Sequence, residues 1–357
     1  MEPLPLWANS LIFVAAAAAV WIAGIALSNQ TDVLATRLHL GTALGGVILL
    51  AVATNLPEIA ITASAAASGN VGVAVGNILG GIAIQTVVLV ILDALGKRQG
   101  PPLTYRAASL VLVVEGLLVL AVLVVVVAGT QLPDNLVFAR VAPGGLLIVA
   151  LWVIGLVLVS RAHRRLSWHE SGEAPDNQDE PQGHSQTKTE AKASERGTST
   201  AKAATIFGGA ALVTLIGGVI LERSGEAIAG DIGLSGVLFG ATVLALATSL
   251  PEISTGLQSV RQGDDQLAVS DIFGGNAFLP VLFLLASLIS GVAILPQAQA
   301  TDIYLTGVGM LLTVVYLAGL LFRPKRRVLG MGIDSFVVLV LYAISLAGLF
   351  AIAAAPH

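Results

Sequence analysis

The sequence predicts an all-α polytopic membrane protein of about ten transmembrane helices, built as two inverted five-helix repeats. Three observations predict this class: an apolar composition, ten apolar stretches of spanning length, and an internal repeat. Of the 357 residues, 55% are hydrophobic and 11% are charged, whereas a soluble globular protein has roughly 25% charged residues. A chain this apolar needs lipid as its solvent, so we expect a multi-pass protein of the cell membrane.

Apolar stretches long enough to cross a bilayer occur along the whole chain. The first is too long for the apolar core of a signal peptide, so we expect it to be a membrane helix. The second and seventh are long, rich in Gly and Thr, and each contains a proline followed by a glutamate. The predicted spans are 6–27, 41–68, 72–92, 106–128, 143–160, 204–221, 234–260, 267–290, 303–322 and 333–354.

One segment differs from the rest of the chain. Residues 161–203 are rich in Ser, Glu, Gln and Lys and contain few aliphatic side chains. Such a composition cannot bury enough apolar surface to fold, so it predicts a disordered linker. The expected organisation is therefore a first membrane repeat over 1–160, the linker over 161–203 and a second membrane repeat over 204–357.

The basic residues predict the orientation. If the N-terminus is outside and the chain crosses ten times, 16 of the 18 Lys and Arg residues lie on the inner side. Only Arg140 and Arg223 lie outside. Because basic residues collect on the cytoplasmic side of membrane proteins, this split predicts that both termini are outside and that 161–203 is a cytoplasmic loop.

The chain matches itself without a gap when it is shifted by 194 residues. Residues 53–59 read ATNLPEI and residues 247–253 read ATSLPEI. Residues 77–81 read NILGG and residues 271–275 read DIFGG. The two copies are five spans apart, and an odd offset makes the second copy enter the membrane from the opposite side. We therefore expect inverted repeats whose second and seventh spans meet near the membrane midplane.

Two glutamates carry the predicted chemistry. Glu58 and Glu252 lie well inside their spans, where a carboxylate costs about 2.5–3.5 kcal/mol and needs compensation. Pro57 and Pro251 precede them and interrupt the helical hydrogen bonding. Carboxylates, freed carbonyl groups and threonine hydroxyls suit hard cations such as Ca²⁺ or Na⁺. The alternative is that each glutamate is protonated or bonds a neighbouring helix as a packing contact.

Other polar residues in the spans are weaker candidates. Asp271 is either a third acidic ligand or an interfacial residue near a helix end, and Asn77 is its counterpart in the first repeat. Gln85 and Asn276 could reach the site as neutral ligands. Glu115 stands in LVVEGLLVL with no counterpart in the second repeat, so it is protonated, paired or at an oligomer face. Asp93, near Lys97, is expected at the membrane interface.

At these residues the chain resembles the cation/calcium exchanger superfamily, whose members carry two inverted repeats. The first family motif reads like GTSLPE, which residues 53–58 and 247–252 match closely. The second reads like GNxxGSNIxN, or with Asp in the last place, which residues 76–85 and 270–279 match in part. The resemblance implies that Glu58 and Glu252 are the central ion ligands.

The resemblance also implies that Thr54 and Thr248 lie beside the central ligands. The residues that follow them, Asn55 and Ser249, are further candidate ligands. The candidate metal ligands are Glu58, Glu252, Thr54, Thr248, Asn55, Ser249, Asp271, Asn77, Gln85 and Asn276.

Some positions depart from the family motifs. Gly81 and Gly275 stand where the family has Ser, and Gln85 and Leu279 stand where it has Asn or Asp. In sodium/calcium exchangers such hydroxyls and amides line the flanking sodium sites. Their partial loss favours coupling to fewer sodium ions, or to protons.

The resulting prediction is a secondary active antiporter that exchanges Ca²⁺ against Na⁺ or H⁺. Its expected partners are the lipid bilayer and small inorganic cations, with no nucleic acid and no cofactor besides the transported ions. An intramembrane enzyme is disfavoured because the spans contain no histidine, no cysteine and no nucleophile next to a base. A degenerate structural or sensory protein of the same fold is the remaining alternative, to which Gly81, Gly275 and Leu279 lend weight.

Overall fold

The protein is an α-helical bundle with one short β-hairpin. A computed structural model describes residues 4–37, 51–96, 100–133, 135–138, 140–164, 199–234 and 236–353. The longer helices are α1 (Leu6–Arg37), α4 (Val71–Leu95), α6 (Leu110–Gly129), α7 (Pro143–Arg164), α9 (Thr200–Ile232), α15 (Ala300–Phe322) and α16 (Ile333–Ala353). The shorter helices are α3 (Leu56–Ala67), α5 (Leu103–Ala107), α10 (Gly236–Phe239), α11 (Ala245–Thr248), α12 (Leu250–Gln262), α13 (Asp265–Phe278) and α14 (Leu282–Ser290).

Eight helical stretches in the described residues are long and apolar enough to cross a membrane. They coincide with eight of the ten predicted spans and confirm a polytopic membrane fold. The other two predicted spans are built from shorter pieces. In the span predicted over 41–68, residues 41–50 lie outside the described residues and α3 begins at Leu56. The span predicted over 234–260 consists of α10, the π-helical segment η2 (Gly240–Leu244), α11 and α12.

The helices next to the predicted linker are longer than the sequence suggested. Helix α7 runs to Arg164, and α9 starts at Thr200 after the cap residue Ser199, whose hydroxyl accepts a hydrogen bond from the Lys202 amide (3.2 Å). Residues 161–164 and 200–203 are therefore helical, so the prediction was wrong at both ends. A capping serine followed by alanines starts a helix readily. The rest of the predicted linker, 165–198, lies outside the described residues.

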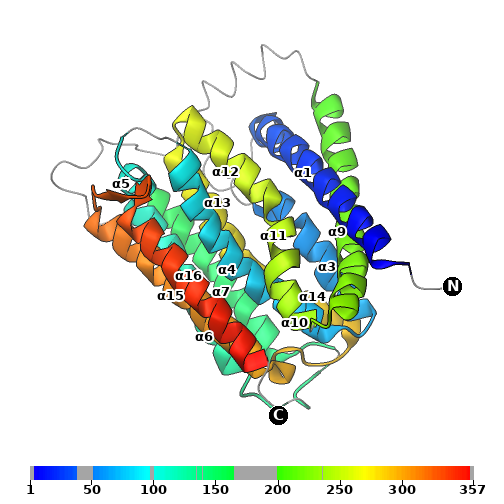
Figure 1. Ribbon diagram of the computed structural model, residues 1–357. Helices are drawn as coiled ribbons and strands as arrows, with labels where there is room; N and C mark the ends of the chain where they lie inside the picture. The colour runs from blue at the N-terminus through cyan, green and yellow to red at the C-terminus, as the bar shows by residue number, and fades with distance from the viewer. Residues whose placement is uncertain are drawn as a thin grey trace.

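Helices from the two halves of the chain lie next to one another (Figure 1). Helices α1 and α9 run side by side along one flank, and α15 and α16 form the opposite flank. Helix α4 lies between them and packs against α13, α15 and α3. The beginning of α1 and the end of α16 lie at the lower right ends of the bundle in Figure 1, whereas α5 and the β-hairpin lie at the upper left.

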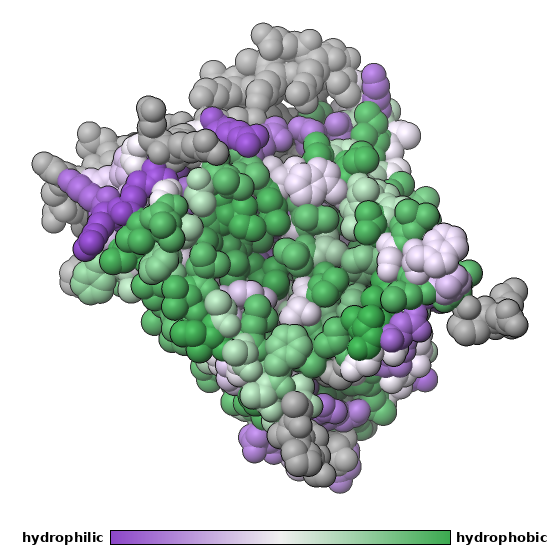
Figure 2. All heavy atoms as spheres, in the orientation of Figure 1, coloured by the Kyte–Doolittle hydropathy of each residue, from purple (hydrophilic) through white to green (hydrophobic). Residues whose placement is uncertain are grey.

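The face of the molecule seen in Figure 2 is apolar over most of its height. Hydrophobic side chains cover the helices, and hydrophilic residues gather mainly toward the two ends of the bundle. Large apolar side chains are more than half exposed on α7, α9 and α16; examples are Leu147, Ile154, Leu212, Ile216 and Ile344. Such a surface is stable only against lipid.

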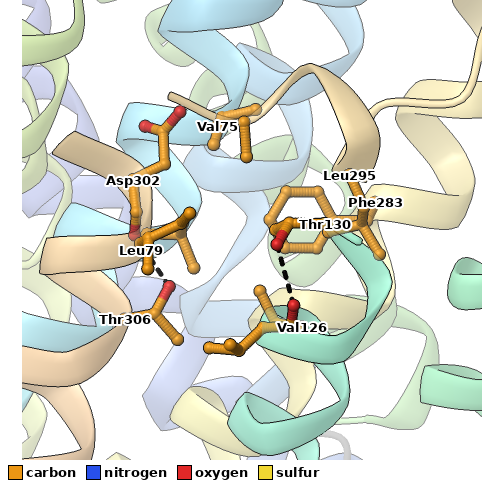
Figure 3. A pocket seen from close by; sticks show the side chains of 11 residues that line it. Val75, Leu79, Val126, Thr130, Phe283, Leu295, Asp302 and Thr306 are labelled. Carbon is orange, nitrogen blue, oxygen red and sulfur yellow. Dashed lines mark hydrogen bonds between the residues drawn. The ribbon is translucent and has the colours of Figure 1, made fainter. Parts of the chain in front are cut away.

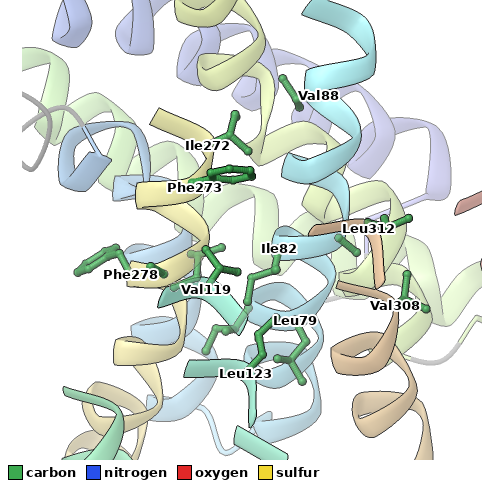
Figure 4. Close-up of a cluster of buried hydrophobic side chains, with 14 of the residues drawn as sticks. Leu79, Ile82, Val88, Val119, Leu123, Ile272, Phe273, Phe278, Val308 and Leu312 are labelled. Carbon is green, nitrogen blue, oxygen red and sulfur yellow. The ribbon is translucent and has the colours of Figure 1, made fainter. Parts of the chain in front are cut away.

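The main hydrophobic core surrounds α4 (Figure 4). Leu79 and Ile82 of α4, Leu123 of α6, Phe273 of α13 and Leu312 of α15 are all buried in it. At Gly80 the backbone of α4 comes so close to Ala241 in η2 that no side chain would fit between them. This close approach brings the broken span against α4, which carries several candidate site residues.

The end of α4 is tied to the C-terminal part of the chain through Asp93. Its carboxylate, expected at the membrane interface, is fully buried. It accepts hydrogen bonds from the amides of Leu103 (2.7 Å) and Gly332 (2.6 Å) and from the Ser335 hydroxyl (2.9 Å). Gly332 belongs to the hairpin formed by β1 (Arg327–Val328) and β2 (Met331–Gly332). Asp93 therefore joins α4, α5 and α16 at one end of the bundle.

Candidate ion-binding site

Two helices break at equivalent places, and each break is followed by a proline and a glutamate. Helix α3 starts after Asn55 (φ −86°, ψ 12°), and α12 starts after Ser249 (φ −78°, ψ 2°). The amides of Asn55 and Ser249 still bond the carbonyls four residues earlier (3.2 and 3.1 Å). Each break is therefore a one-residue kink. It places the following glutamate in the first turn of a new helix, near the favourable positive end of the helix dipole.

The carboxyl groups of Glu58 and Glu252 are buried, with 0% and 1% of each residue exposed. None of their four carboxyl oxygens makes a well-formed hydrogen bond with another described residue. The two carboxyls are close enough for the charge of Glu58 to act on Glu252. Two buried carboxyl groups this close together need a proton or a cation for stability.

Each glutamate has a threonine from the other half of the chain as its neighbour. Thr248 of α11 lies beside Glu58, and Thr54 lies beside Glu252. The hydroxyls donate to the carbonyls three residues earlier in their own helices, at 3.3 Å for Thr54 and 3.1 Å for Thr248. A hydroxyl that donates to the backbone still presents oxygen lone pairs, which a cation can use.

Asp271 of α13 also acts electrostatically on Glu252. It is 4% exposed, and it accepts a hydrogen bond from the Thr255 hydroxyl of α12 at 3.3 Å. Its second oxygen, Oδ1, has no hydrogen-bond partner among the described residues. Asn77, its counterpart on α4, is fully buried, and neither end of its amide is hydrogen-bonded within the described part of the chain.

An amide pair fills the space next to Glu58. Gln85 of α4 lies beside Glu58 and donates from Nε2 to Oδ1 of Asn55 (3.1 Å). Asn55 in turn donates to the Ala51 carbonyl (2.6 Å). A Cβ atom at Gly275 would lie 3.0 Å from Nδ2 of Asn55 and 3.2 Å from Oε1 of Gln85. The glycine of α13 therefore makes room for this pair.

The remaining candidates are buried as well. Asn276 donates to the Thr86 hydroxyl (3.0 Å) and so joins α13 to α4. The Ser249 hydroxyl donates to the Ala245 carbonyl (2.8 Å). Within the residues that the structure describes, no three His, Cys, Asp or Glu side chains are grouped closely enough to hold a metal ion. A cation in this region would therefore combine carboxylates with hydroxyl and amide oxygens, as hard cations accept.

A comparison with known protein families identifies the group to which this molecule belongs. The model of the sodium/calcium exchanger protein family matches residues 9–172 and 202–352. The chain belongs to this family. The match covers both predicted repeats, and the family and its fold are those of transporters rather than enzymes.

Curated relatives of this exchanger-family chain cover most of its length. The inner membrane protein YrbG of Escherichia coli is 28% identical over 259 residues, which cover 72% of each chain. The putative antiporter CaxA of Alkalimonas amylolytica is 28% identical over 274 residues, or 76% of this chain and 77% of that protein. Human sodium/potassium/calcium exchanger 1 is 40% identical over 73 residues, which cover 19% of this chain and 7% of that protein.

Solved structures of exchangers share the fold. The H⁺/Ca²⁺ exchanger CAX superposes with a TM-score of 0.66 and 13% identity, covering 98% of this chain and 88% of that one. The sodium-calcium exchanger NCX_Mj superposes with a TM-score of 0.61 and 16% identity, covering 96% and 99%. At these identities the likeness establishes the fold.

In this exchanger-family chain, two glycines contact the two prolines of the broken helices. A Cβ atom at Gly24 of α1 would lie 2.6 Å from Cβ of Pro251, and one at Gly218 of α9 would lie 2.9 Å from the Pro57 carbonyl oxygen. Gly24 and Gly218 are 194 residues apart, as are Pro57 and Pro251. The helix that opens each half therefore packs on the proline of the other half.

A separate apolar cleft lies between α4, α6, α14 and α15 (Figure 3). It is narrow and is lined by Leu79, Val126, Phe283 and Leu295, among others. Its polar residues already have bonds: Thr130 donates to the Val127 carbonyl, Thr306 donates to the Asp302 carbonyl, and Asp302 caps α15. None of the ten candidate ligands lines it, so it is separate from the candidate ion-binding site.

Three buried residues next to the candidate ligands were not singled out from the sequence. Thr255 donates to Asp271, Thr86 accepts from Asn276, and Ser270 donates to Glu115 (3.0 Å). Thr255 lies three residues after Glu252, which is about one helical turn. This spacing could have predicted that the two side chains lie on the same face of the helix. The role of Ser270 depends on the packing of α13 against α6.

Proposed function

We propose that the chain is a secondary active antiporter that exchanges Ca²⁺ for Na⁺ or H⁺ at a midplane site centred on Glu58 and Glu252. The observation that carries this proposal is the reciprocal arrangement of the two glutamates. Each carboxyl is buried, lacks a well-formed hydrogen bond among the described residues, and lies beside the threonine of the other half. The names of the relatives, a putative antiporter and a sodium/potassium/calcium exchanger, agree with it.

The charge of the site favours a divalent ion. Two carboxylates in a medium of low dielectric repel each other, and one divalent cation neutralises both. Six to eight oxygen ligands suit Ca²⁺, and the hydroxyls of Thr54 and Thr248 add to the four carboxyl oxygens. When the cation leaves, protons on the glutamates can remove the same repulsion. The site can therefore alternate between Ca²⁺ and protons without leaving a bare charge in the membrane.

The contacts between the two halves support inverted repeats. Gly24 and Pro251 are related to Gly218 and Pro57 by the same shift of 194 residues that relates the sequence motifs. A reciprocal exchange of contacts is what a two-fold axis in the membrane plane produces. We propose ten spans in two repeats, 1–160 and 204–357. Eight of them are the long apolar stretches, and the other two are the spans that kink before Glu58 and Glu252.

We propose that both termini face outside and that the segment between α7 and α9 is a cytoplasmic linker. The basic residues carry this orientation. The placement of the start of α1 and the end of α16 at one end of the bundle agrees with an even number of crossings.

The packing beside the site supports coupling to protons or to few sodium ions. The Gln85–Asn55 pair occupies the space that Gly275 leaves. At the positions that the shift of 194 residues relates to Gln85 and Gly275, Leu279 lies against Gly81: a Cβ atom at Gly81 would be 3.2 Å from Cδ1 of Leu279. A large side chain thus stands opposite a glycine in both repeats, and the leucine of the second repeat offers no ligand for an alkali cation.

Counterflow in proteoliposomes tests the proposal. Purified protein is reconstituted, and ⁴⁵Ca²⁺ uptake is followed with a Na⁺ gradient or a pH gradient imposed separately. We expect uptake to follow at least one gradient and to be lost in Glu58→Gln and Glu252→Gln. Flux that is absent under both gradients, in protein that is folded and inserted, would favour the degenerate, non-transporting alternative.

A further inference from the structure

A third buried glutamate lies outside the pair proposed to hold the ion. Glu115, on α6, is 7% exposed and accepts a hydrogen bond from the Ser270 hydroxyl of α13 at 3.0 Å through Oε1. Its Oε2 atom has no hydrogen-bond partner among the described residues. An ionisable group at this depth in a membrane helix is costly, so a role that offsets the cost is expected.

The fold itself does not require this contact. The shift of 194 residues relates Glu115 to Gly309 and Ser270 to Gly76. It also relates the interface between α6 and α13 to the interface between α15 and α4, and both interfaces are formed. At the second interface Gly309 lies against the Ile82 side chain, with 3.2 Å between its added Cβ and Cγ2. The second interface therefore forms with glycine at both of the positions that are equivalent to Glu115 and Ser270.

The hydrogen bond between Ser270 and Glu115 lies next to a position at which the two repeats differ in charge. Ser270 immediately precedes Asp271, whose counterpart in the first half is the neutral Asn77. Asp271 acts electrostatically on Glu252, whereas the polar neighbour of Glu115 is Ser270. Glu115 therefore reaches the ion site through the helix that carries Asp271.

A second contact holds the same helix. The Arg106 side chain binds both carboxylate oxygens of Asp265, at 2.9 and 3.1 Å, at the start of α13. The Glu115 contact is five residues further along, or roughly 7.5 Å at the rise of an α-helix. Two contacts at different heights determine both the axial position and the rotation of α13, which one contact cannot do.

We propose that Glu115 is a positioning residue: through Ser270 it holds α13 in the rotation that places the Asp271 carboxyl beside Glu252. This role rests on the proposed function, because it gives Asp271 a part in binding the divalent ion. It predicts that Glu115 affects the affinity for Ca²⁺ without binding the ion itself, and that a hydrogen-bond acceptor is needed there rather than a charge.

Equilibrium binding of Ca²⁺ to the purified full-length protein tests this role without depending on transport. The shift of the thermal unfolding midpoint is measured against Ca²⁺ concentration for Glu115→Gln, Glu115→Leu and Ser270→Ala. Glu115→Gln keeps an acceptor oxygen and should bind Ca²⁺ as the parent does. Glu115→Leu and Ser270→Ala should each weaken binding roughly 10-fold, and the double change should be no weaker, because coupled residues are not additive.

Two further variants separate positioning from general damage. Thr313→Val removes another buried hydroxyl, one that donates to the Gly309 carbonyl of its own helix (2.8 Å), and it should leave Ca²⁺ affinity unchanged. In an Asp271→Asn background, Glu115→Leu should cause no additional loss of affinity, since the carboxyl that it positions is gone.

The outcomes distinguish the two proposals. If the parent protein shows no Ca²⁺-dependent shift, the proposed function and the role of Glu115 both fail. If the parent binds Ca²⁺ and Glu115→Leu binds equally well, only the positioning role fails. Weak binding by Glu115→Gln would also overturn it, because a requirement for the charge would make Glu115 an ion ligand. Should Glu115→Leu not fold, the smaller change Ser270→Ala decides the same question.

Discussion

Gly24 lies directly against Pro251, with 2.6 Å between a Cβ atom placed on the glycine and Cβ of the proline. The same added atom would be 3.2 Å from Cα of Pro251, so the backbone itself limits the space. Helix α1 can therefore approach the kink before Glu252 only because residue 24 has no side chain. Gly218 plays the same part against Pro57.

Gly24→Val should consequently push α1 away from α12. Overpacking of this kind costs about 1–3 kcal/mol, so we expect a lower unfolding temperature and reduced ⁴⁵Ca²⁺ flux. Gly208→Val on α9 is the matched control, because nothing lies within 4 Å of an added Cβ there. If Gly24→Val equals the control in both measurements, the close packing of α1 on Pro251 has no energetic importance.

Glu58→Gln and Glu252→Gln should each abolish Ca²⁺ flux, and the double change should look no worse. Each substitution keeps the shape and one oxygen ligand but leaves a single carboxylate to neutralise a divalent ion, a loss of several kcal/mol by analogy with broken buried pairs. Flux is measured in proteoliposomes after chromatography shows folded protein. Near-normal flux in both single variants would assign the pair to helix packing.

The dependence on the driving ion should show few sodium ions or none. Ca²⁺ uptake is measured against graded Na⁺ gradients at fixed pH, and then against graded pH at fixed Na⁺. We expect uptake to respond to pH, or to Na⁺ with a Hill coefficient near one, because Gly81, Gly275 and Leu279 stand where the family motif has hydroxyl or amide ligands. A Hill coefficient near three for Na⁺ would contradict this interpretation of the motif.

The segment between α7 and α9 should face the cytoplasm. A single cysteine introduced at Ser185 is suitable, because the chain has no cysteine of its own. It should resist an impermeant thiol reagent in intact cells and react after permeabilisation. Labelling from outside would reverse the orientation inferred from the basic residues.

Asp93→Ala should destabilise the protein. The change leaves the buried amides of Leu103 and Gly332 without their acceptor, and each orphaned donor costs about 1–3 kcal/mol. The unfolding midpoint should therefore fall, while Asp231→Ala, an exposed residue of α9, should leave it unchanged. Equal midpoints for the two variants would show that Asp93 is not a structural anchor.

The membrane fold could be predicted from hydropathy, since eight predicted spans coincide with long apolar helices. The predicted ends of the helices were less accurate at places where a capping residue or a turn, rather than hydropathy, determines where the helix begins. The span predicted from residue 106 is divided into α5 and α6, because Ala108 and Ser109 are extended and the Ser109 hydroxyl caps α6 at the Val111 amide. Hydropathy does not register such a break between two apolar segments.

The candidate ligands were found from a repeated motif, and all ten lie in buried positions. Their pairing was not predictable in the same way. That Thr54 lies beside Glu252, and Gln85 beside Glu58, depends on how one half packs against the other. Thr255 and Ser270 were missed because buried hydroxyls in this chain also bond their own helices, as Thr313 and Ser290 do, so residue type alone does not identify a cross-helix donor.

Because Thr54 lies beside Glu252 and Thr248 beside Glu58, the surroundings of the proposed ion depend on the alignment of the two halves. A relative slip of one residue along a helix, about 1.5 Å, would lengthen both contacts together. The ion would then lose a neighbour on each side at the same moment. The affinity for the ion would therefore be highest in one alignment of the two halves. Any movement of one half along the other would weaken binding.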